Sequence, residues 1–343
     1  MQHEILDKKP LLDENGQLTE PGFAKSLILD YDRNAIKAPG LRIKEWDYYL
    51  ITNDDYAIAL TIDDNSYMGL DSISFIDFRA PFEITTSKIS AFTMGKVGFP
   101  ASSSIGDINR NRKNYSISFA KDSGTRTLTF HMENFHNNKP IDGKIVLYNV
   151  QGDSMVIATP FDKAGHFYYN QKINCMPASG SVNFDGKKYE FEPKSSFGVL
   201  DWGRGVWTYK NTWFWGSASG AIDSVPFGFN IGYGFGDTSA ASENMIFYDQ
   251  KAHKLDQVTF NIPKNAAGND DFMSPWTFTS NDGRFEMDFV PIIDRAADSN
   301  IGIIRSNQHQ VFGLFTGIAT LDDGTVINVK DFLGFAEKVF NKW

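Results

Sequence analysis

The chain has 343 residues, a single cysteine and a formal net charge of −9. This length suffices to bury one large core or two smaller ones without covalent cross-links, and Cys175 alone cannot form an internal disulfide. The excess of acidic residues argues against a nucleic-acid backbone as partner.

The first residues are polar and charged, without the apolar stretch of a signal peptide, and no run is long enough to span a bilayer. A lone thiol fits a reducing compartment better than a secreted one. We therefore expect a cytoplasmic protein without a transmembrane segment. No pattern in the sequence predicts its oligomeric state.

Strand patterns begin after a loop-like N-terminal tail and recur along most of the chain. Tyr56, Ile58, Leu60 and Ile62 alternate onto one face between two clusters of turn residues, at 53–55 and 63–65. Further strands are expected at 115–120, 127–135, 144–150 and 189–192. Sustained helical periodicity is nearly absent, so the sequence predicts an all-β fold of antiparallel hairpins.

Two segments have helical spacing. One is 18–28, and the other is 331–343, where Phe332, Phe335, Val339 and Trp343 lie roughly one turn apart. The Pro- and Ser-containing stretch near 193–198 indicates a boundary between two β units. We expect an N-terminal unit over 1–195, with its tail, and a C-terminal unit over 196–343, ending in the terminal helix.

The segment 225–237, VPFGFNIGYGFGD, is the most one-sided strand. Its large side chains fall on one face, and Pro226, Asn230 and four glycines fall on the other. Such a strand suits a sheet curved into a small barrel, where glycines relieve crowding or allow another group to approach closely. The hairpin around Asp322-Asp323-Gly324 alternates small and large residues in a similar way.

The segment 201–215, DWGRGVWTYKNTWFW, holds four of the seven tryptophans. Trp207 and Tyr209 share one face of a strand, and Trp213 and Trp215 share a face further on. Indole rings at this density form an apolar wall suited to a rigid or extended hydrophobic ligand. The alternative is that the rings only fill the core, and ring density alone does not decide between the two.

Charged residues accompany these rings. Asp201 and Arg204 flank Gly203, and they either pair as a buried clamp at the closed end of a barrel or orient a polar group of a ligand. We favour the clamp. Glu243 and Asn244 follow the one-sided segment 225–237, here called the glycine strand. A carboxyl group facing an apolar cavity would have a raised pKa and could donate a proton.

The six histidines show no metal-ligand spacing, and we expect neither a metal site nor a cofactor. His131 and Glu133 share a strand face that is more simply explained as a solvated polar surface.

The chain resembles the bacterial family known as domain of unknown function 2804. The resemblance covers nearly the whole length and rests on KEWDYYLI at 44–51, FGVLDWGRGVWTYKNTWFWGSASG at 197–220, FGFNIGYGFGDTSAASENMIFYD at 227–249, HQVFGLFTG at 309–317 and GFAEKVFNKW at 334–343. More distantly, in architecture alone, it is similar to the two-barrel lipocalin-like proteins that include carotenoid hydratases and tocopherol cyclases. That likeness implies two calycin-type antiparallel barrels with few short helices, and a hydrophobic substrate protonated by a carboxylic acid.

Our first hypothesis is a lipocalin-like protein that encloses an apolar small molecule, an isoprenoid or lipid. Any reaction would be an acid-catalysed hydration or cyclisation, with Asp201 or Glu243 as proton donor. The expected ligand-binding residues are Trp202, Arg204, Trp207, Tyr209, Trp213, Trp215, Asn230, Tyr233 and Asn244. The alternatives are a carbohydrate-binding or carbohydrate-processing protein and a purely structural module.

Overall fold

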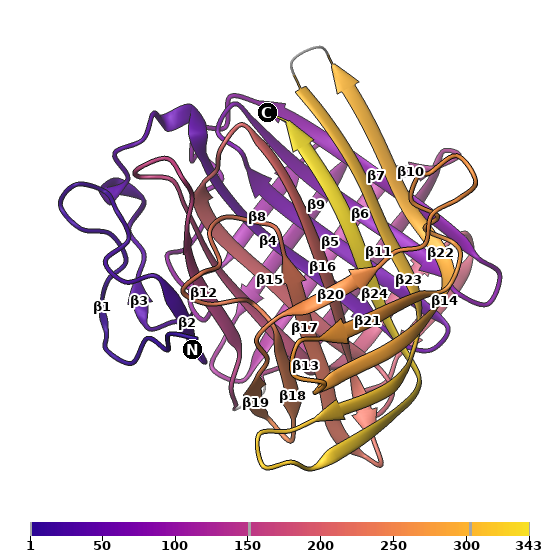
Figure 1. Ribbon diagram of the computed structural model, residues 1–343. Coiled ribbons are helices and arrows are strands. Elements are labelled where there is room, and N and C mark those ends of the chain that lie inside the picture. Colours follow the sequence, from indigo (N-terminus) through magenta and orange to yellow (C-terminus); the bar gives the residue numbers. More distant parts are fainter. Residues whose placement is uncertain (1, 150–151, 302–303, 343) are drawn as a thin grey trace.

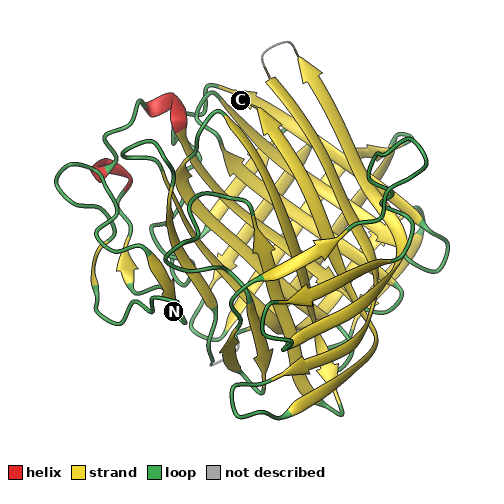
Figure 2. Ribbon diagram, in the orientation of Figure 1, coloured by secondary structure: helices red, strands yellow, loops and turns green. Residues whose placement is uncertain are grey.

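The computed structural model describes residues 2–149, 152–301 and 304–342 (Figure 1). Regular structure in these ranges is almost entirely β strand, in two large antiparallel sheets and a small parallel pair (Figure 2). The described helical segments are two 3-10 turns, η1 at Arg33–Ala35 and η2 at Gly40–Arg42. The expected all-β fold with few short helices is confirmed. None of the described helices is long or apolar enough to cross a membrane.

The first sheet runs in the order β7-β6-β5-β4-β15-β13-β11-β10-β9-β8, and β2, β12 and β14 pair beside this path. Its strands are β2 (Gly22–Ala24), β4 (Ile43–Thr52), β5 (Tyr56–Asp64), β6 (Met68–Asp77), β7 (Phe82–Ala91), β8 (Ile108–Arg112), β9 (Tyr115–Lys121), β10 (Thr125–His136), β11 (Lys139–Tyr148), β12 (Met155–Pro160), β13 (Phe167–Phe184), β14 (Lys187–Phe191) and β15 (Phe197–Val206). The parallel pair is β1 (Lys9–Pro10) with β3 (Leu29–Asp30).

The second sheet runs in the order β19-β18-β17-β16-β24-β23-β22-β21-β20. Its strands are β16 (Lys210–Ile222), β17 (Val225–Tyr233), β18 (Met245–Tyr248), β19 (Lys251–Lys254), β20 (Val258–Asn261), β21 (Trp276–Ser280), β22 (Phe285–Ile301), β23 (Ile304–Thr320) and β24 (Val326–Lys342).

Both sheets curl into half-barrels, and each wraps its own apolar core (Figure 1). Phe119, Phe130 and Trp202 belong to the first core, and Phe229, Phe278 and Phe315 to the second. The outer faces of the two half-barrels also carry apolar side chains, which pack against each other in two further clusters. Because strand side chains alternate, β4, β13, β15, β16, β17 and β24 each contribute one face to a core and the other to the interface between the sheets.

The long strand β13 contains a bulge at this interface. Its register with β15 shifts between Ile173 and Met176, and Cys175 adopts a left-handed backbone with φ 60°. The bulge turns Asn174 toward the second sheet, where its Nδ2 donates to Ser217 Oγ at 2.8 Å and to Phe229 O at 3.2 Å. One buried amide therefore ties β13 to both β16 and β17.

The expected terminal helix is wrong, because residues 326–342 form β24, paired with β16 and β23. Ile327 and Val329 face the second core. Asp331 then has φ 48°, and the alternation changes phase, so that Phe335 faces the interface. In a strand that is buried on both faces, and whose core-facing positions change from odd to even numbers, the apolar residues are spaced three or four apart. This is also the spacing expected for a helix. Trp343 lies outside the described residues.

The expected helix over 18–28 is also wrong, since its centre is strand β2. Gly22 lies so close to the chain before it that an added Cβ would be 2.7 Å from His3 O. This segment is held by pairing with β12 and by the first residues of the chain, which helical backbone would not allow.

The chain changes from the first sheet to the second between β15 and β16, after Val206. The expected boundary at 195–196 lies one strand earlier. The division of the chain into two β-barrel units at 195–196 stays a prediction.

Candidate functional site

Strand β15 sends neighbouring residues of the tryptophan-rich segment to opposite sides of the first sheet. Trp202 and Arg204 point into the first core and are fully buried. Asp201 points to the interface, where it is 8% exposed.

The expected pairing of Asp201 with Arg204 is therefore wrong: residues three apart on a strand face opposite sides. Arg204 donates from Nη2 to Asp47 Oδ1 at 3.0 Å and from Nη1 to Trp46 O at 2.7 Å, and its guanidinium lies 4.2 Å from the ring centroid of Trp202. It is a clamp within the first half-barrel.

Asp201 instead pairs with a lysine of β13. Lys172 Nζ lies 2.9 Å from Asp201 Oδ1, and it also sits 3.8 Å above the ring of Trp215 from the second sheet. Asn170 donates to the same carboxylate oxygen at 2.6 Å. The buried ion pair thus lies directly against the indole of the opposite sheet.

Glu243 is linked to Trp215 through Asn230. The indole Nε1 of Trp215 donates to Asn230 Oδ1 at 2.7 Å, and Asn230 Nδ2 donates to Glu243 O at 2.8 Å and more weakly to its Oε2 at 3.3 Å. A Cβ on Gly232 would lie 2.7 Å from Glu243 Oε1. The bare face of the glycine strand is what lets this carboxyl group approach, as the sequence predicted.

Glu337 of β24 is a third carboxyl group at the interface, and the sequence analysis missed it. Trp213 Nε1 donates to its Oε1 at 3.1 Å, and Gln310 Nε2 donates to its Oε2 at 3.0 Å. In register it is the cross-strand partner of Trp215. The expected helix concealed it, because only a strand places Glu337 beside the tryptophans. We call Lys172, Asp201, Glu243 and Glu337 the carboxyl cluster.

Five rings lie beside the carboxyl cluster: Trp46, Tyr168, Trp207, Trp213 and Phe235, here called the aromatic cluster. Trp46 stacks on Tyr168 at 5.9 Å and 9°, and it meets Trp207 edge to face at 5.1 Å. Phe235 contacts Tyr168, Trp207 and Trp213 at centroid distances of 4.8 to 5.1 Å. A Cβ on Gly203 would be 1.9 Å from Trp46, so this glycine is required for the indole to cross β15.

The remaining predicted residues lie elsewhere. Tyr233 stacks on Phe214 in the second half-barrel, and Tyr209 is 44% exposed near the start of β16. Asn244 accepts from Gly232 N at 2.6 Å and donates to Asp256 O at 2.9 Å, which fixes the loop that carries Glu243. The structure therefore brings together Asp201, Trp207, Trp213, Trp215, Asn230 and Glu243, with Asn244 supporting them, and separates Trp202, Arg204, Tyr209 and Tyr233 from that group.

The electrostatics of the carboxyl cluster follow from three acids around one ammonium group. Loss of water raises the pKa of Glu337 to about 7, with Asp201 adding to the rise and Trp213 and Lys172 opposing it. Loss of water likewise raises the pKa of Glu243, against Lys172 and Asn230. Burial, and then the charges of the three carboxyl groups, raise the pKa of Tyr168. The cluster can therefore hold protonated carboxylic acid near neutral pH.

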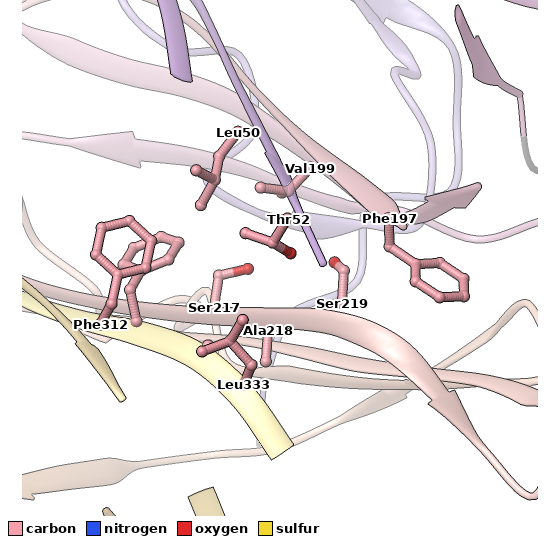
Figure 3. Close-up of a pocket in the computed structure, with 11 residues that line it drawn as sticks. Leu50, Thr52, Phe197, Val199, Ser217, Ala218, Ser219, Phe312 and Leu333 are labelled. Atoms are coloured by element: carbon pink, nitrogen blue, oxygen red, sulfur yellow. The ribbon is translucent and has the colours of Figure 1, made fainter. Parts of the chain in front are cut away.

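A small cleft lies further along the same interface, lined by apolar side chains such as Leu50, Val199, Phe312 and Leu333 and by the hydroxyls of Ser217 and Ser219 (Figure 3). Its free space is roughly that of one water molecule. Within the described part of the chain, no three His, Cys, Asp or Glu side chains are grouped so that they could hold a metal ion.

Two curled antiparallel sheets, packed face to face with acids and indoles between them, define a two-half-barrel protein with an interface site. The chain belongs to the family described as domain of unknown function (DUF2804), whose model matches residues 2–343. No curated protein was found to match it.

Two solved structures share the fold. A protein provisionally assigned as AttH from Nitrosomonas europaea superposes with a TM-score of 0.55 at 11% identity, covering 90% of this chain and 96% of that one. Kievitone hydratase from Nectria haematococca superposes with a TM-score of 0.52 at 13% identity, covering 97% and 98%. The expected family and the expected two-part β architecture are confirmed.

Proposed function

We propose that this protein binds an apolar, unsaturated small molecule of isoprenoid or lipid type at the aromatic cluster and adds a proton to it from the carboxyl cluster. The observation that carries the proposal is the placement of three carboxyl groups and one ammonium group directly beside five aromatic rings. Acid-catalysed hydration or cyclisation needs a neutral acid and a surface that stabilises positive charge on carbon, and the two clusters supply these.

Glu243 is the proposed proton donor. Burial is the largest cause of its raised pKa and exceeds the opposing effects of the Lys172 charge and of the long hydrogen bond that Asn230 donates to its Oε2. Asp201 forms an ion pair with Lys172 at 2.9 Å, and we assign it the role of balancing the lysine charge.

In a hydration, the proton of Glu243 would bond to one alkene carbon and leave a cation on the other. Water would add to the cation, and the proton it releases would return to the glutamate. In a cyclisation, a second double bond would attack the cation in place of water and leave a new cation in the ring. Loss of a proton from a neighbouring carbon to the glutamate would then form the double bond of the product. The indole faces of Trp46 and Trp213, both partly exposed, are the proposed contacts for the cation.

Kievitone hydratase shares this fold and is a hydratase by name, which supports the proposed class of reaction. The carbohydrate alternative calls for exposed, coplanar rings. Here Trp207 meets Trp46 at 76° and Trp213 at 67°, between the sheets, so the rings offer no flat platform for a sugar.

The test uses the Glu243→Gln variant, which keeps the shape of the side chain and removes its acidic proton. Purified protein is incubated with a panel of isoprenoid and unsaturated fatty alkenes in ¹⁸O-labelled water, and products are analysed by mass spectrometry. We expect labelled alcohol or cyclised product from the native protein and a loss of roughly 100-fold or more in the variant.

Ligand binding is followed separately through tryptophan fluorescence. Glu243→Gln should still bind the alkene, Trp213→Ala should bind it more weakly, and Glu190→Gln, at an exposed site, should behave as the native protein. Equal turnover by native protein and Glu243→Gln would refute the assigned donor. Absence of binding by every alkene, with intact folding, would refute the function itself.

A further inference from the structure

The turn that follows β7 holds two large apolar side chains out in solvent. Phe92 is 66% exposed and Met94 is 42% exposed, and both have a left-handed backbone with φ 50°. Bulky side chains rarely adopt this conformation, and they keep it only where the surroundings fix it.

A buried carboxylate fixes this turn. Asp64 accepts a hydrogen bond from Thr93 Oγ1 at 2.7 Å and another from Gly95 N at 2.8 Å, while Met94 N donates to Ser66 O at 3.0 Å. Thr93 therefore points inward. Its neighbours Phe92 and Met94 are forced outward together, so their exposure is part of how the turn is built.

The segment around η2 lies against this turn and continues the exposed apolar surface. A Cβ on Gly40 would be 3.4 Å from Met94 Cε, and the next residue, Leu41, is 48% exposed. Arg33 packs on Gly95 in the same way. We call Leu41, Phe92 and Met94 the apolar tip.

The charge around the apolar tip is opposite to that of the whole molecule. Residues 33–44 and 86–98 contain none of the 42 acidic residues and six of the 33 lysines and arginines, of which Lys44 is buried and Arg33 pairs with Glu45. Lys37 and Lys96 are exposed. The nearest acids in sequence are already engaged, because Asp32 caps η1 through Asn34 N and Glu45 pairs with Arg33.

We infer that the apolar tip docks on a lipid bilayer that carries anionic headgroups. Apolar side chains on a rigid turn, with the exposed Lys37 and Lys96 in the same two segments, match the two attractions that hold a peripheral protein at a bilayer. These are burial of apolar surface among acyl chains and attraction to negative headgroups. Because the protein carries a net charge of −9, attraction to negative headgroups needs a local surface without acidic residues, and the segments around the apolar tip meet this requirement.

The apolar tip is connected to the proposed site through the residue that follows Leu41. Arg42, which follows Leu41, donates from Nη2 to the backbone oxygen of Trp207 in the aromatic cluster at 2.5 Å. Docking would bring that cluster near the bilayer, where apolar molecules are dissolved. The inference nevertheless stands without the proposed reaction, because it depends only on the tip.

The experiment is co-sedimentation with vesicles of phosphatidylcholine, with and without phosphatidylglycerol, at low and high salt. We expect binding to the anionic vesicles, weaker binding at high salt, and a loss of roughly tenfold in the double variant Phe92→Ser, Met94→Ser. The matched control is Met273→Ser, Val290→Ser, which removes two side chains of similar exposure, 48% and 55%, from the second half-barrel. Thermal unfolding checks that both double variants fold.

Unchanged affinity in the Phe92→Ser, Met94→Ser variant would overturn the inference, as would absence of binding to every vesicle composition. Sedimentation-velocity runs without vesicles test another occupant: a dimer that depends on Phe92 would mean that the tip pairs with a second copy of the chain, and would also overturn it. Lys96→Glu should weaken anionic binding, and Lys194→Glu, an exposed lysine outside the basic segments, should not.

Discussion

Glu337 gives the interface site a measurable dependence on pH. Its pKa rises from 4.5 to about 7 on folding, chiefly because burial removes water from the carboxyl group. The folded state then binds more protons than the unfolded state between these two values, so this residue makes the protein less stable as pH rises through that window. The penalty is complete above about pH 7 and absent below about pH 4.5.

We expect Glu337→Gln to remove this penalty. The amide oxygen keeps one acceptor for Trp213 or Gln310, while its NH2 group replaces the acceptor of the other, and this cost does not depend on pH. The stability of the variant relative to the native protein should therefore rise by on the order of 1–3 kcal/mol between pH 5 and pH 8. Urea unfolding at both pH values measures it, with Glu192→Gln at an exposed site as the control. A constant difference across pH would show that Glu337 is ionised in both states.

At the scale of single residues, the members of the site can be predicted from the sequence only where the alternation of strand side chains is clear. Trp213, Trp215 and Glu243 could be selected because indoles and an acid follow one-sided strands. Lys172 and Glu337 could not, since each lies on a strand that pairs far along the chain and neither belongs to a local pattern. The predicted pairing of Asp201 with Arg204 is wrong because it rests on their closeness in sequence. Alternation along β15 places the two side chains on opposite faces of the sheet.

At the scale of elements, the bulge of β13 decides how the two half-barrels dock. Asn174 Nδ2 is buried and donates across the interface to Ser217 Oγ and Phe229 O. Removing the amide would leave these acceptors without that donor in a buried interface. We expect Asn174→Ala to lower the free energy of unfolding by about 1–3 kcal/mol. Asn183→Ala is the control on the same strand, since its side chain is exposed.

If Asn174→Ala and Asn183→Ala cost the same, the amide does not contribute to docking. Near-UV circular dichroism offers a second measurement, because Trp213 and Trp215 lie in the same interface and their signal should change only in the Asn174 variant.

Elements were predictable where one face is apolar and the other is not. The glycine strand β17 and the Asp322–Gly324 hairpin follow directly from alternation and turn residues. The sequence predicts a helix in the second half of β24 because few of its side chains are exposed on either face after the change of phase at Asp331. Where a sheet packs on a core with one face and on a second sheet with the other, its strands have no polar face. Strand prediction from alternating polar and apolar residues then fails.

At the scale of the whole molecule, the packing argues for one cooperative unit. Each half-barrel has its own core, yet Tyr48 and Val199 of the first sheet share a cluster with Trp215, Phe312 and Phe335 of the second. Separating the sheets would expose this apolar surface together with the carboxyl cluster. Neither half-barrel can therefore unfold without destabilising the other, even though the two are consecutive in the chain.

The prediction is tested with one matched substitution in each core, Phe119→Leu in the first and Phe229→Leu in the second, both fully buried in the native protein. In scanning calorimetry we expect a single transition for the native protein and for each variant, lowered by a few degrees in both, because either cavity weakens the same cooperative unit. The calorimetric and van't Hoff enthalpies should agree. Two transitions, with each substitution shifting only one of them, would instead mean that the half-barrels are independent domains joined after Val206.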